Sequence, residues 1–167
     1  AADIALQSRS GEYALAAAKA WQEDHPQSRE ANRYVLQILI ALNKVGETAG
    51  PLRQFIEQAP LPNRVGILSA VPQMYGRIAD KAAAVSAVKE ALKGELENRS
   101  TGAAAWISLG RLQLAADDKA ASLQSLAKAK AMDPTYEGQA RLALELMDEG
   151  ISAAEPFVRE YLEKHSN

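Results

Sequence analysis

Apolar side chains recur along this chain at the spacing of an α-helix. Val35, Ile38, Leu39 and Leu42 fall on one helical face. Similar stripes occur later in the chain, at Val85, Val88 and Leu92 and at Leu142, Leu146 and Met147. Alanine, the best helix former, is frequent, and strand-favouring residues are sparse. The pattern predicts an all-α chain with helices over residues 1–9, 13–24, 29–44, 48–58, 64–78, 81–97, 102–115, 119–131, 136–148 and 152–164.

The clearest internal pattern lies in residues 103–134, AAAWISLGRLQLAADDKAASLQSLAKAKAMDP. Gly110 and Ser122 are small enough to let two antiparallel helices approach each other closely. Asp117 and its neighbour mark a turn between those helices, and Pro134 marks the point where the second helix has stopped. The segment therefore predicts a helical hairpin built for stacking.

This hairpin resembles the tetratricopeptide repeat (TPR), a 34-residue pair of helices. It departs from the repeat at Gln113, where the family prefers tyrosine, and at Ser122, where it prefers alanine. The resemblance implies an α-α superhelix, or solenoid, without catalytic activity. It rests on Trp106, Leu109, Gly110, Leu126, Ala129 and Pro134.

Turn signals extend the same frame over the whole chain. Gly11, Gly46, Ala79, Asp117 and Gly150 follow one another at steps of 35, 33, 38 and 33 residues. We therefore expect about five TPR-like helix pairs in a single array, with a kink or a late helix start caused by the prolines near residues 60–72. The expected pairs cover residues 1–28, 29–62, 63–101, 102–135 and 136–167.

Composition adds mainly exclusions. The chain has no cysteine, which excludes disulfides, zinc–thiolate sites and cysteine nucleophiles. Its net charge of −2 does not favour binding to nucleic acid or anionic membranes, and no apolar run is long enough to span a membrane. His25 and His165 lack metal-ligand spacing, and no nucleophile or phosphate-binding motif occurs. We expect no catalytic residue, no metal site and no cofactor.

A solenoid of this type offers a concave groove lined by the first helix of each pair. In the fifth pair, the frame places Ala140, Leu144, Met147 and Asp148 on the groove side. Basic residues recur at one equivalent place of the earlier pairs, which predicts an acidic peptide partner, although helix C-termini attract basic residues in any case. The predicted ligand-binding residues are Arg9, Arg33, Leu36, Ile40, Lys44, Gln73, Arg77, Ile107 and Arg111.

The function predicted from these features is that of a protein-binding scaffold. The alternatives are a structural spacer or oligomerisation module of a bacterial envelope protein and, less favoured, an RNA-binding helical repeat. The apolar stripe of the last helix, with Phe157 and Tyr161, offers a site for self-association. The opening residues are already in helical rhythm, so we expect a fragment of a longer chain. Residues 2–26 loosely resemble Ala-rich repeats of bacterial envelope TPR proteins, which implies a bacterial source and either an envelope or periplasmic location or, otherwise, the cytoplasm.

Overall fold

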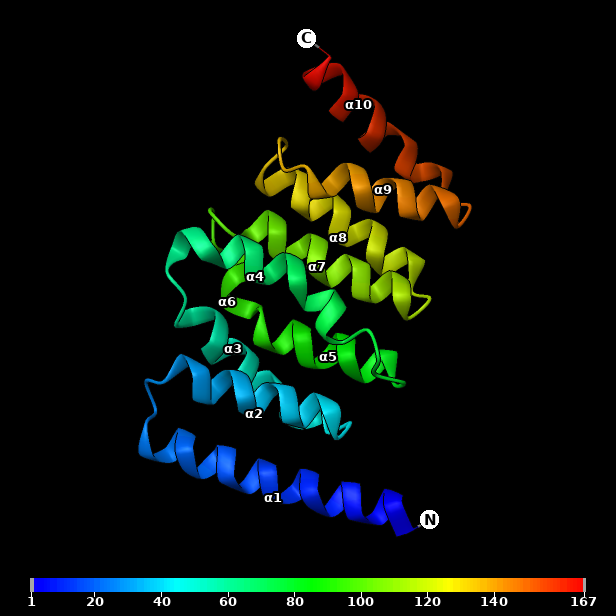
Figure 1. Cartoon of the computed structure of the whole chain (residues 1–167). Helices are drawn as coiled ribbons and strands as arrows, with labels where there is room; N and C mark the ends of the chain where they lie inside the picture. Colours follow the sequence, from blue (N-terminus) through cyan, green and yellow to red (C-terminus); the bar gives the residue numbers. More distant parts are fainter. Residues whose placement is uncertain (1, 167) are drawn as a thin grey trace.

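Ten α-helices and two short 3-10 helices make up most of residues 2–166. This is the part of the chain that the computed structural model describes, with side chains described for Gln7 and from residue 9 onward. No strand occurs among these residues. The helices stack from α1 at one end to α10 at the other, and the termini lie at opposite ends (Figure 1). The predicted all-α superhelix is thus confirmed. The elements are α1 (Ala2–Asp24), α2 (Arg29–Ala41), η1 (Val45–Glu47), α3 (Ala49–Glu57), α4 (Leu61–Met74), α5 (Lys81–Ala91), α6 (Lys93–Glu97), α7 (Gly102–Ala115), α8 (Lys119–Met132), α9 (Gly138–Asp148), η2 (Ser152–Ala154) and α10 (Glu155–His165).

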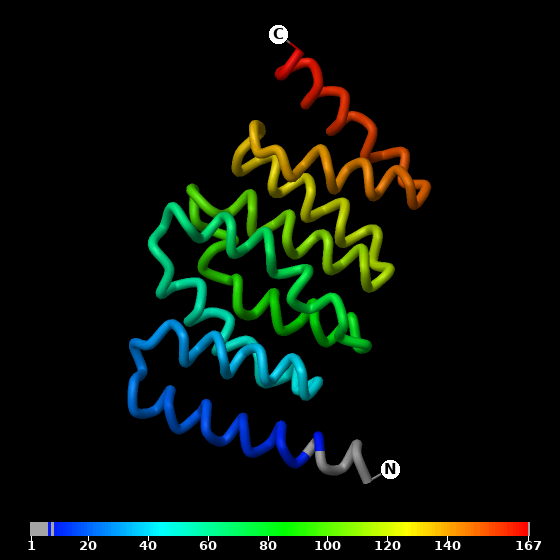
Figure 2. The backbone as a smooth tube through the Cα atoms, in the orientation of Figure 1, coloured from blue at the N-terminus to red at the C-terminus, as the bar shows by residue number. Residues whose placement is uncertain are grey.

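The first predicted turn, at Gly11, does not exist. Helix α1 runs without a break through this position, as the unbroken blue part of its coil in Figure 2 shows. A Cβ atom at Gly11 would lie 2.5 Å from Cδ2 of Leu42. The glycine therefore allows α1 and α2 to pack closely, and residues 1–28 hold one helix instead of a helical hairpin.

Helices α2, α4 and α5 end three or more residues earlier than predicted. Helix α2 stops at Ala41, because Asn43 adopts a left-handed backbone conformation with φ 59°. The helix predicted over residues 81–97 is divided at Leu92 into α5 and α6. Asp80 caps α5 by accepting a hydrogen bond from the backbone N–H of Ala83, which agrees with the turn expected there.

Helix α4 begins earlier than the predicted residue 64. Pro62 lies in its first turn, where a missing N–H costs nothing. Pro72 lies in its last turn and cannot donate to the carbonyl of Leu68. The hydroxyl of Ser108 on α7 donates to that carbonyl instead, at 2.8 Å. A hydrogen bond between helices thus replaces the one that proline removes within α4.

The hairpin of α7 and α8 has the close packing that its small residues predict. A Cβ atom at Gly110 would lie 2.7 Å from Cδ2 of Leu142 and 3.2 Å from Cβ of Ser125. Ser122 donates a hydrogen bond to the carbonyl of Gly110 at 2.8 Å. The turn between the helices contains Asp117 at φ 61°. The close packing thus depends on the small residues Gly110 and Ser122, and the turn depends on Asp117.

Three apolar clusters form the core along the stack. The largest joins α2 to α7, the second joins α7 to α10, and a small one joins α1 to α2. Trp106 and Tyr136 pack against both of the larger clusters. The middle and the C-terminal parts of the stack therefore share a continuous apolar interior.

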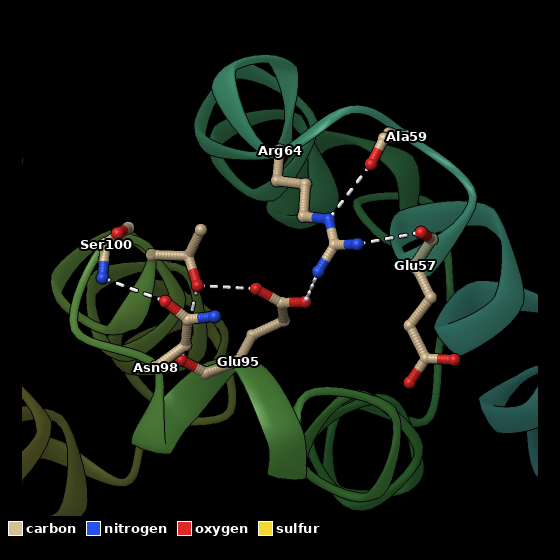
Figure 3. A network of polar contacts seen from close by, with 7 residues as sticks. Glu57, Ala59, Arg64, Glu95, Asn98 and Ser100 are labelled. Atoms are coloured by element: carbon tan, nitrogen blue, oxygen red, sulfur yellow. Dashed lines mark hydrogen bonds and ion pairs between the residues drawn. The ribbon is translucent and has the colours of Figure 1, made fainter.

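One buried ion pair reinforces the corner where α3, α4 and α6 meet (Figure 3). The guanidinium of Arg64 donates to Glu95 at 2.8 Å and to the backbone carbonyls of Glu57 and Ala59 at 2.8 and 3.0 Å. The second carboxylate oxygen of Glu95 accepts from the hydroxyl of Thr101 at 2.5 Å. Both charges are therefore hydrogen-bonded, as burial of an ion pair requires.

Candidate functional site

A groove runs over three helices, α4, α7 and α9, which begin the third, fourth and fifth predicted pairs. It consists of two adjoining hollows that share Ser69, Pro72, Arg111 and Arg141. The first hollow encloses about 430 Å³ and extends to Tyr161 of α10. The second is more open and reaches Asp148 at the C-terminal end of α9. The two hollows together therefore extend over α4, α7, α9 and part of α10.

The first hollow has an apolar floor. Ala104 and Ile107 of α7 are 2% and 5% exposed, so they form part of the core as well as the floor. Leu144 of α9 lines the same hollow and is 49% exposed, so about half of this apolar side chain is open to contact. The floor thus offers an apolar surface to a partner without disturbing the core.

Tyr136 lines the first hollow together with this apolar floor. Its hydroxyl lies 3.2 Å from the hydroxyl of Ser69, which links α4 to the segment before α9. A Cβ atom at Gly138 would lie 2.5 Å from Cε1 of Tyr136, so the glycine makes room for the ring. This contact joins segments 67 residues apart and fixes one wall of the first hollow.

Two arginines bring positive charge to the groove, and their surroundings differ. The guanidinium of Arg111 binds both carboxylate oxygens of Glu145, at 3.0 and 3.3 Å. Arg141 is exposed, and no carboxylate of the described residues lies within ion-pair distance of it. Arg141 is therefore the cation that remains open to a partner.

Three of the predicted ligand-binding residues lie in the groove, namely Gln73, Ile107 and Arg111. Arg77 is exposed in the turn after α4 and lines neither hollow. The prediction for Leu36 is wrong, because this side chain is fully buried in the core. Ile40 is partly buried and packs against the same core.

The predicted basic row is also corrected by the structure. Lys44 forms an ion pair with Glu12 at 3.0 Å, and Arg111 is paired with Glu145. Arg33 lies over the ring of Tyr34 on its own helix, with 5.6 Å between the guanidinium carbon and the ring centroid. Arg9 is exposed within α1, two residues before Gly11, where a turn was predicted. Lys44 and Arg111, two of the five predicted cationic residues, are thus already paired with carboxylates of the chain.

Sequence reasoning missed Arg141, although a signal for it was present. A step of 34 residues, the length of one repeat, leads from Ile107 to Arg141 and from Arg111 to Glu145. The frame based on turns was one residue out of register here and selected Met147, which packs against the core. Ala140, Leu144 and Asp148 do line the groove, as that frame predicted.

The two histidines lie away from any cluster of metal-binding side chains. The ring of His165 stacks on Tyr161, with ring centroids 4.1 Å apart. His25 is exposed after the end of α1. Within the described residues, no group of three His, Asp or Glu side chains is placed to hold a metal ion. No helix of that part of the chain is sufficiently long and apolar to cross a membrane.

Comparison with known proteins supports the fold. No protein-family model matches the sequence, and no curated protein sequence matches it either. The crystal structure of the MamA protein, which contains TPRs, is similar, with a TM-score of 0.52 and 16% sequence identity. The match covers 98% of this chain and 87% of that one. The chain has a TPR-type solenoid fold. At this identity the likeness concerns the fold alone.

Proposed function

We propose that this chain is a non-catalytic scaffold that binds a segment of a partner protein in the groove of α4, α7 and α9. The observation that carries the proposal is the half-exposed Leu144 beside the buried Ile107, in a hollow rimmed by hydrogen-bonding side chains. Apolar pockets with a few convergent polar groups are the usual form of a binding site. A solenoid presents such a surface without needing any catalytic residue.

The test uses peptides of known sequence. Twelve-residue peptides would be selected on the wild-type chain from a random phage-displayed library, and their affinities measured by fluorescence anisotropy. Replacing Leu144 by serine should weaken binding up to about tenfold, because Leu144 is already half-buried and covering the rest of its side chain contributes up to about 1.5 kcal/mol. Leu61→Ser is the matched control, since Leu61 is 45% exposed but lies outside both hollows.

Peptides that bind wild type and L61S equally but bind L144S more weakly, by up to about tenfold, would support the groove. Equal affinity for all three proteins would place binding elsewhere and contradict the proposal. A library that yields no binding peptide would contradict it as well.

Self-association through α10 stays a prediction. Phe157 packs partly against the core, and the ammonium group of Lys130 lies 5.2 Å from its ring centroid. Tyr161 lines the first hollow, so it belongs to the groove as well as to the last helix. The charge of the partner is likewise a proposal, and it depends on Arg141.

A further inference from the structure

We infer that the groove recognises a partner segment with an aliphatic or aromatic side chain next to a carboxylate, and that Arg141 binds this carboxylate. The inference rests on the proposed function and specifies its ligand. It assigns to Arg141 the role that the sequence suggested for Arg111. Among the charged side chains of the groove, Arg111 is paired with Glu145, and Glu149 is paired with Lys119. The groove-lining charges without an ion pair among the described residues are Arg141, Glu137 and Asp148.

Arg141 lies next to the apolar floor of the first hollow. Arg141 and Leu144 are three residues apart on α9, which places their side chains on adjacent parts of one helical face. Both line the first hollow together with Ile107. An apolar side chain that covers Leu144 and Ile107 therefore brings the neighbouring side chains of its own segment close to Arg141.

The two arginines of the groove differ in whether a carboxylate of the chain already binds them. Glu145 binds Arg111 through both carboxylate oxygens, so a ligand would have to displace an existing pair to use Arg111. Glu137 also lines the hollow and stands four residues before Arg141, but it makes no ion pair with it. A pair of this kind on an exposed helix surface is weak, so it would not withhold Arg141 from a ligand.

The guanidinium group of Arg141 favours a carboxylate as its ligand. An arginine presents a rigid fork of donors that matches a carboxylate. A single apolar anchor gives little discrimination between partners, whereas a charge that must be matched gives much more. The pair formed by Leu144 and Arg141 thus defines both the anchor and the selectivity.

The experiment is a reversal of charge on both sides of the contact. Peptides selected on the wild-type chain should be enriched in Asp or Glu within about three residues of a large apolar residue. Arg141→Glu should weaken the binding of these peptides about tenfold or more, and replacing the acidic residue of the peptide by lysine should restore binding to that variant. Arg99→Glu is the matched control, because Arg99 is exposed after α6, lines neither hollow and changes the net charge equally.

Three results would overturn the inference. They are a selected pool without acidic enrichment, a loss of affinity in R99E equal to that in R141E, and a lysine-substituted peptide that gains nothing on R141E. Peptides that lose affinity on L144S but not on R141E would leave the groove as the binding site and reject only the role of Arg141. The two proposals therefore fail separately.

Discussion

At the scale of single residues, a hydrogen bond that a proline removes from one helix is replaced by a side chain of the neighbouring helix. Pro72 deprives the carbonyl of Leu68 of its partner within α4, and Ser108 of α7 replaces that partner. Ser108 is buried and Pro72 lies at the edge of the groove. The same hydrogen bond thus holds α4 against α7 where the two helices form the groove.

Replacing Ser108 by alanine should lower the free energy of unfolding by about 1–2 kcal/mol, because it leaves a buried carbonyl without a donor. The loss should be smaller when Pro72 is also replaced by alanine, since the new N–H can reach Leu68 within the helix. Urea unfolding followed by circular dichroism would measure the four proteins of this cycle. Ser86→Ala is the matched control, because Ser86 of α5 is exposed and makes no side-chain hydrogen bond to the described residues. Strict additivity of the two changes would contradict this explanation.

Tyr75 is the one described residue for which burial shifts an ionisation strongly. Burial raises its pKa to about 12 from an ordinary 10.0, against a hydrogen bond to Thr48 that acts in the opposite direction. The unfolded chain therefore releases this proton at lower pH than the folded chain does. The neutral phenol contributes stability that is complete below pH 10 and is lost as the pH rises toward 12.

Between about pH 9 and pH 11, the free energy of unfolding of the wild type should fall about 1 kcal/mol further than that of Tyr75→Phe. Phenylalanine keeps the buried ring and has no proton to release, so it isolates the phenol from every other titrating group. Urea unfolding at several alkaline pH values would measure both proteins. Parallel pH profiles would contradict the assignment.

At the scale of helices, the sequence predicts that a helix forms far better than it predicts the residues at which the helix begins and ends. Turn signals were enough to locate α7 and α8, because Asp117 and Asp118 mark the turn between them and Pro134 marks the end of the second helix. Gly11 was misleading, because a glycine has two uses and only the neighbouring helix decides between them. Here the neighbour is Leu42, 31 positions further along, and no local pattern contains that information.

The same limitation applies to the groove. Its helices could be predicted, and so could Gln73, Ile107 and Arg111, because one well-marked repeat fixed the frame. The pairing of Arg111 with Glu145 could not, because it depends on how two successive repeats pack in space. The burial of Leu36 was missed for a similar reason, since a helix between two neighbours buries more than one face.

The ion pair of Arg64 and Glu95 should stabilise the corner of α3, α4 and α6. Its side chains are 21% and 7% exposed, so removal of one partner leaves a largely buried charge. Glu95→Ala should lower the free energy of unfolding by about 2–3 kcal/mol, whereas Glu97→Ala on the exposed side of α6 should change it by less than about 0.5 kcal/mol. Thermal and urea unfolding would measure both. Equal effects would show that the buried pair contributes no more than a surface charge.

At the scale of the whole molecule, function depends on the order of the stack. Helices α4, α7 and α9 do not follow one another in the chain, yet they line one groove because α7 packs against both α4 and α9. No single repeat contains the floor, the tyrosine wall and the unpaired arginine. Binding is therefore expected to require the folded array.

The most direct measurement is a nuclear magnetic resonance titration of the ¹⁵N-labelled chain with a selected peptide. Our account predicts that the largest amide shifts fall on the groove residues of α4, α7 and α9, around Ser69, Ile107 and Leu144, while α1 and α2 stay unchanged. Shifts concentrated on α1 and α2, or on α5 and α8, would contradict the claim that this groove is the binding site.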